Sequence, residues 1–126
     1  MDQGAAILVW LRTFEKFVRE RNFEDAKLLY KDSPTLFGTR VEHSTDIEYY
    51  YKFQWSKIWN QSENFSITQV VQIESGIPFS FSAVLWTNTT FIDELKVERS
   101  GRATFVYEIE DGVPKAIHSH FSESPK

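Results

Sequence analysis

The sequence predicts an α+β fold in which helices come first and pack on one face of an antiparallel sheet. Two periodicities indicate this order. Over residues 5–33 and 45–60 the apolar side chains recur three and four residues apart, as on one face of a helix, and from Phe65 onward they alternate with period two, as in strands. The 126 residues contain no linker and no internal repeat, so we expect one domain over residues 1–126.

Three helices are predicted before the sheet. Residues 5–20 place apolar side chains on one face and charged side chains on most of the other. Residues 22–33 form the second helix, which begins at an asparagine N-cap and stops before Pro34. A short strand over residues 35–41, interrupted by a glycine, leads to a third helix over residues 45–60, which begins with a capping box and carries an aromatic stripe.

Strands follow the third helix, and we expect them over residues 65–73, 77–85, 95–97, 102–109 and 113–121. Ser75-Gly76 and Asp111-Gly112 are typical of hairpin turns. Gly101 permits a bend or a bulge before the fourth of these strands. Residues 122–126 are predicted to form a loose tail.

Composition excludes several classes of function. Cysteine is absent, which rules out disulfides, a thiol nucleophile and zinc–thiolate or iron–sulfur sites. The net charge of -4 weighs against nucleic acid as a partner, and no apolar run approaches the roughly 20 residues of a membrane span. The acidic start over residues 1–4 lacks the basic region of a signal peptide. We therefore expect a cytoplasmic protein with no nucleic-acid or membrane partner and, since no phosphate-binding loop is present, no cofactor.

The order of elements and several short motifs resemble the nuclear transport factor 2-like superfamily, and within it the SnoaL-like group. The motifs lie at the start of the second helix, after that helix, and at the end of the chain: Phe23-Glu24, Leu36-Phe37-Gly38-Thr39, and Asp111-Gly112 followed by Ile117-His118-Ser119-His120-Phe121-Ser122. The His-x-His-x-Ser ending and the pattern from Asp46 through Trp55 to Trp59 are also similar to the association domain of calmodulin-dependent protein kinase II.

This resemblance implies a cone, in which a curved sheet wraps around the helices and leaves a partly apolar pocket at its open end. It also implies a homodimer or a larger homo-oligomer, because members of the superfamily usually pair through the outer face of the sheet. The superfamily includes isomerases, dehydratases, cyclases, transport factors and oligomerisation domains, so the fold by itself does not determine the function.

His118 and His120 are the candidate catalytic residues. Residues two apart on a strand point the same way, so both imidazoles belong on one face. One of them is a candidate general base or a hydrogen-bond donor to a ligand, because histidine titrates near neutral pH. The alternatives are a structural pair and a metal site. A metal ion would need a third ligand, and no local ligand pattern supplies one, so we predict no metal site.

The candidate ligand-binding residues combine these histidines with an arginine and several aromatic residues. Arg102 is a candidate clamp for a carboxylate, since arginine binds carboxylates in a fork and the association domains have pocket arginines. Its alternative role is an ion pair with Glu98 or Glu108. Five aromatic residues are candidates for the pocket wall, with an ordinary core role as the alternative for each: Phe37, Tyr51, Trp55, Trp59 and Trp86.

The sequence thus predicts a homodimeric domain that binds a small organic molecule, aromatic or carboxylate-bearing, in an aromatic pocket closed by Arg102, His118 and His120. One alternative is an enzyme of isomerase, dehydratase or cyclase type with a histidine base. Ketosteroid-isomerase-like members use a carboxylate base in the strand after the second helix, and the corresponding residues 36–39 contain no Asp or Glu. The second alternative is an oligomerisation domain without a ligand.

Overall fold

The computed structural model describes residues 2–125 and has three helical segments, two before the first strand and one after it. The first is α1 (Gln3–Glu20), whose N-cap Asp2 accepts a hydrogen bond from the backbone N–H of Ala5 at 2.7 Å. A short α2 (Phe23–Lys27) follows. The third helix is continuous but changes its hydrogen-bonding pattern in the middle, and it consists of α3 (Ile47–Tyr50), the π-helical segment η1 (Tyr51–Trp55) and α4 (Ser56–Trp59).

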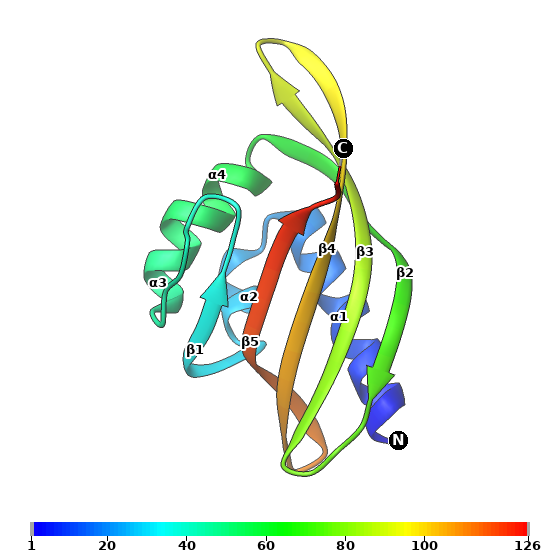
Figure 1. The fold of residues 1–126 in the computed structure, drawn as a ribbon. Coiled ribbons are helices and arrows are strands. Elements are labelled where there is room, and N and C mark those ends of the chain that lie inside the picture. Colours follow the sequence, from blue (N-terminus) through cyan, green and yellow to red (C-terminus); the bar gives the residue numbers. More distant parts are fainter. Residues whose placement is uncertain (1, 126) are drawn as a thin grey trace.

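Five strands form one curved sheet: β1 (Tyr30–Phe37), β2 (Ser62–Glu74), β3 (Phe79–Ile92), β4 (Leu95–Glu110) and β5 (Val113–Glu123). Their order across the sheet is β1-β5-β4-β3-β2, with β1 parallel to β5 and all other neighbours antiparallel. Figure 1 shows α1 packed behind the sheet, the third helix beside β1, and the β3–β4 hairpin reaching past the other strands. The predicted α+β class is therefore confirmed, with one parallel pair in the sheet.

The core lies between the helices and the inner face of the sheet. Its largest buried side chains from α1 are Ile7, Trp10, Leu11 and Phe14, which meet buried residues of β4 such as Phe105 and Tyr107. The outer face of the sheet carries no helix among the described residues (Figure 1). Functional side chains are thus divided into an inner set, which faces the helices, and an outer set, which faces away from them.

Polar side chains of α1 fasten the helix to the edge strand β2. Arg12 donates to the carbonyl oxygen of Ile67 at 3.1 Å, and Glu15 accepts from the N–H of the same residue at 2.6 Å. Arg19 donates to the carbonyl oxygen of Phe65 at 2.6 Å. These bonds satisfy backbone groups of an edge strand that has no further strand beside it.

The second helix is shorter than predicted, and the strand after it begins earlier. The helix ends at Lys27, and Tyr30 already belongs to β1. The parallel neighbour explains the difference, because Ala116 of β5 donates to the carbonyl oxygen of Leu29 at 2.9 Å and the Tyr30 hydroxyl bonds Ser119 at 3.2 Å. Pairing with a strand more than 80 residues away overrides the local helical pattern.

Several strand boundaries also differ from the prediction. Residues 95–110 form one strand without a register shift at Gly101, and β5 includes Ser122 and Glu123, which were predicted to lie in the tail. The last residue of that predicted tail, Lys126, lies outside the described residues. Register shifts between β2 and β3 break the predicted alternation of β2 and leave Val71 exposed while Val70 packs on the core.

Candidate functional site

A cavity lies between the third helix, α1 and the inner face of the sheet. It encloses about 50 Å³, counted as the space open to the centre of a water molecule. A single water molecule needs much less space than this, so the cavity has room for a small organic molecule. Aromatic side chains from α1, the third helix and three strands make up most of the wall: Phe14, Trp55, Trp59, Phe65, Trp86 and Phe121.

The aromatic wall is held together by ring contacts. The indoles of Trp55 and Trp59 stack with centroids 4.8 Å apart, and the ring of Phe14 meets them edge-on at 6.3 and 6.0 Å. Trp55 and Trp59 are four residues apart on the third helix and so lie on one face of it. The wall is therefore built from interlocked rings, which presents a fixed apolar surface to the cavity.

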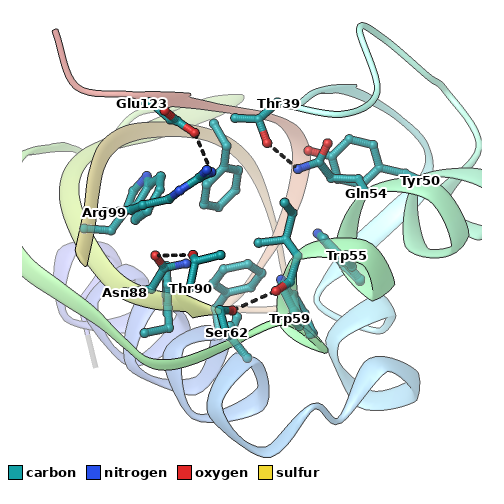
Figure 2. A pocket seen from close by; sticks show the side chains of 16 residues that line it. Thr39, Tyr50, Gln54, Trp55, Trp59, Ser62, Asn88, Thr90, Arg99 and Glu123 are labelled. Carbon is teal, nitrogen blue, oxygen red and sulfur yellow. Dashed lines mark hydrogen bonds and ion pairs between the residues drawn. The ribbon is translucent and has the colours of Figure 1, made fainter. Parts of the chain in front are cut away.

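Gln54 and Tyr50 fix the loop that borders the cavity beside the third helix. The Gln54 carbonyl oxygen accepts from the N–H groups of Arg40 and Val41 at 2.6 and 3.0 Å, and its amide donates to the Thr39 hydroxyl at 3.0 Å (Figure 2). The Tyr50 hydroxyl donates to the carbonyl oxygen of Phe37 at 3.0 Å. Burial raises the pKa of Tyr50 well above its usual value, so its hydroxyl stays protonated and remains a donor.

The opposite wall is polar and comes from β3, β4 and the end of β5. Arg99 Nη1 and Glu123 Oε1 lie 2.8 Å apart, and Figure 2 shows the two side chains meeting at the edge of the cavity. Asn88 is paired with Arg99 in the strand register, and its side-chain oxygen accepts from the Thr90 hydroxyl at 3.3 Å.

Trp86 also lines the cavity and carries a buried donor. Only 6% of its surface is exposed, and its Nε1 is the one buried side-chain polar atom without a hydrogen-bond partner within residues 2–125. A buried N–H without an acceptor is costly, and an acceptor on a bound ligand would remove that cost. The polar wall can therefore donate hydrogen bonds to an anionic or carbonyl-bearing molecule.

The structure brings three of the five predicted aromatic residues to the cavity and places the other two, Tyr51 and Phe37, elsewhere. Trp55, Trp59 and Trp86 line it. Tyr51 does not; its ring packs on Phe23 at 5.0 Å, and the ammonium of Lys27 lies 4.2 Å from the ring centroid. Tyr51 therefore stabilises the contact between α2 and the third helix.

His118 and His120 lie on the outer face of the sheet, away from the cavity, as does Phe37 beside them. The Phe37 ring meets both imidazoles edge-on at 5.3 and 5.5 Å. His118 Nδ1 lies 2.8 Å from the carbonyl oxygen of Thr35. The intervening residue Ser119 is fully buried and bonds Tyr30, so the alternation along β5 turns both histidines outward.

Arg102 also faces outward, which corrects its predicted place at the pocket. On β4 the inward residues are Gly101, Ala103 and Phe105, and Arg102 lies between two of them. Arg102 makes no ion pair within the described chain; its suggested partner Glu108 pairs with Lys31 instead. The arginine at the cavity is Arg99, and extending the apolar alternation of β4 back through Gly101 is the sequence signal that would have found it.

No protein-family model matches the sequence, and no curated protein does. Solved structures match it over nearly its whole length. A nuclear transport factor 2-like superfamily protein from Salmonella enterica is 12% identical with a TM-score of 0.85, and the match covers 98% of this chain and 92% of that one. A ketosteroid isomerase-like protein from Erwinia carotovora is 13% identical with a TM-score of 0.80, and the match covers 98% of each chain.

A third structure is described as a putative calcium/calmodulin-dependent protein kinase II association domain, from Xanthomonas campestris. It is 19% identical with a TM-score of 0.79, and the match covers 95% of this chain and 86% of that one. Together these likenesses confirm the predicted nuclear transport factor 2-like fold. The finer assignment to the SnoaL-like group stays a prediction.

Between residues 2 and 125, no three His, Asp or Glu side chains gather in an arrangement that could hold a metal ion. None of the helices there combines the length and the apolar character that crossing a bilayer requires.

Proposed function

We propose that this chain binds a small organic molecule with an aromatic or other apolar body and a carboxylate group. The observation that carries the proposal is the composition of the cavity, in which interlocked aromatic rings face Arg99 and the lining residue Trp86 carries an unpaired Nε1. Apolar pockets with a few convergent polar groups are the usual form of small-molecule sites. In this proposal Arg99 has the carboxylate-clamp role that was predicted for Arg102.

The two walls suit the two parts of such a ligand. Stacked and edge-on rings offer apolar contact area to a flat body. The Arg99 guanidinium keeps N–H groups that are not engaged by Glu123, and charge-assisted hydrogen bonds from such groups to a carboxylate are about twice as strong as neutral ones. Asn88 and Trp86 lie on the neighbouring strand and supply neutral donors.

The test is a titration with matched probes, benzoate and phenylacetate, followed by calorimetry and by the fluorescence of the three cavity tryptophans. We expect Arg99→Gln to weaken binding of both acids by about ten-fold or more, because it removes a charged donor. Arg102→Gln is the matched control: it removes the same charge from the same strand on the opposite face, and we expect unchanged affinity. Loss of binding in Arg102→Gln but not in Arg99→Gln would refute the site.

The enzymatic alternative has less support in the cavity than ligand binding does. Its lining includes one carboxylate, Glu123, which is already paired with Arg99, and no imidazole. The likeness to a ketosteroid isomerase-like protein keeps an isomerase-type activity as the second candidate. Turnover of an enolisable ketone that survives in the double variant of His118 and His120 would favour a base other than histidine.

We also propose that the protein is a homodimer that pairs through the outer face of the sheet. That face exposes apolar residues on neighbouring strands, among them Val71, Phe79 and Phe81. Two structurally similar proteins are described as putative or established kinase association domains, which is consistent with a fold used for assembly. An exposed apolar sheet face of this kind is typical of an interface.

Size-exclusion chromatography with light-scattering detection measures the molar mass of the assembly. We expect a mass of twice the 14.8 kDa chain for the wild type. Phe81→Arg should give a monomer, since it puts a charge opposite Val106 at the centre of the face, whereas Phe53→Arg on the exposed side of η1 should leave the dimer intact. A wild-type monomer would refute the proposal, and a ring of many subunits would favour the oligomerisation alternative.

A further inference from the structure

We infer that Glu123 competes with the ligand's carboxylate for Arg99 and so sets the preference of the site between anionic and neutral ligands; this inference rests on the proposed function. Glu123 and Arg99 both line the cavity, and they contact each other at 2.8 Å. The chain thus supplies its own carboxylate at the position where a ligand carboxylate would bind.

The backbone places these two side chains together and leaves them free to exchange partners. Glu123 is paired with Gly101 across β4 and β5, two residues from Arg99. The N–H of Ser124 donates to the carbonyl oxygen of Ser100 at 3.0 Å, which anchors the chain just beyond Glu123. The two side chains are only partly covered, with 34% of Arg99 and 40% of Glu123 exposed. An ion pair with this exposure stabilises a protein little and is readily broken.

A ligand acid that reaches Arg99 has two ways to bind, and Glu123 opposes both. If the acid replaces Glu123, the existing ion pair is lost. If the acid uses the remaining N–H groups of the guanidinium, two carboxylates lie side by side, and like charges repel. Arg99 is the one cation among the lining residues of the cavity, so nothing else there offsets the second negative charge.

The Glu123 carboxylate does not oppose the binding of neutral ligands in this way. An amide or a ketone can accept a hydrogen bond from Arg99, Asn88 or Trp86 without bringing a second charge next to Glu123. Removing the charge of Glu123 should therefore strengthen binding of acids and leave binding of their amides as it was. This contrast separates a competing carboxylate from a residue that only shapes the cavity, because a shape change would affect both ligands of a matched pair.

The experiment compares benzoate with benzamide and phenylacetate with phenylacetamide by calorimetry on the full chain. We expect Glu123→Gln to bind both acids about five-fold more tightly than the wild type and both amides equally. Glu108→Gln is the matched control: it removes a carboxylate from another partly exposed ion pair, with Lys31, near the far end of β4, and should change neither affinity. Thermal melts of all three proteins check that they are folded.

The outcomes separate this inference from the function on which it rests. Acids that bind the wild type and Glu123→Gln equally well, or bind the variant more weakly, would overturn the competition while leaving the cavity a ligand site. Acids and amides that gain equally would also overturn it, since the effect would then be one of shape. If no probe binds the wild type or any variant, the proposed function itself fails, and the inference with it.

Discussion

Replacing Phe14 with alanine should lower the free energy of unfolding by about 3–5 kcal/mol. Phe14 is 1% exposed, and its ring lies within 5.5–6.3 Å of six other aromatic rings, from helices and strands alike. Its removal would take away a large apolar surface and leave a void that those rings cannot close together. Urea unfolding followed by circular dichroism measures the change.

The control for this prediction is Phe53→Ala. Phe53 is 40% exposed on η1 and lies outside the core, so we expect a change within about 0.5 kcal/mol. If Phe14→Ala cost no more than this control, the cavity wall would not be the packed aromatic cluster described above. Phe14→Ala should also enlarge the cavity, and binding of a bulkier aromatic acid than benzoate would reveal that enlargement.

Gly101→Ala should destabilise the protein by about 1–3 kcal/mol and disturb the cavity at the same time. A Cβ at this position would overlap the Trp86 indole and the carbonyl oxygen of Ser122. The side chain could be accommodated only by moving the indole toward the cavity or by opening β4 from β5. We expect a lower midpoint of unfolding and a shifted tryptophan emission, both measured on one set of urea titrations.

Gly4→Ala is the matched control for the glycine prediction. A Cβ at Gly4 would meet its nearest neighbours, Asp2 and Ser75, at 3.5 and 3.7 Å, which is ordinary contact. Alanine is also the better helix former in the first turn of α1, so this variant should be neutral or slightly more stable. Equal behaviour of the two alanine variants would contradict the close packing of Trp86 on β4.

Local patterns predicted those features of the fold that local physics decides. Asn22 caps α2 as predicted, because a short polar side chain accepts a hydrogen bond from a free N–H group at the start of a helix. The third helix also begins with such a cap, although its N-cap is Asp46 and not Thr45, where the predicted capping box began. Asp111-Gly112 turns the chain between β4 and β5 with both residues at positive φ. The aromatic stripe of the third helix faces the core at Tyr50, Trp55 and Trp59.

Local sequence patterns did not predict which distant segments pair with each other. Tyr30 belongs to β1 because it pairs with the parallel strand β5. No residue near Tyr30 in the sequence predicts this pairing. The register shifts in β2 reverse its alternation, so Val71 faces outward although its spacing from Ile67 predicted an inward side chain. Gly101 suggested a bulge, whereas its missing side chain makes room for Trp86 from the neighbouring strand.

The candidate site, like the fold, could be predicted only in part from the sequence. The sequence by itself determined an aromatic-rich α+β domain and singled out Trp55, Trp59 and Trp86, because their burial follows from helical and strand periodicity. Only the tertiary structure decided that Arg99, and not Arg102, belongs to the cavity. A period of two fixes which residues share a face of a strand, but the side on which the helices pack determines which face is inside.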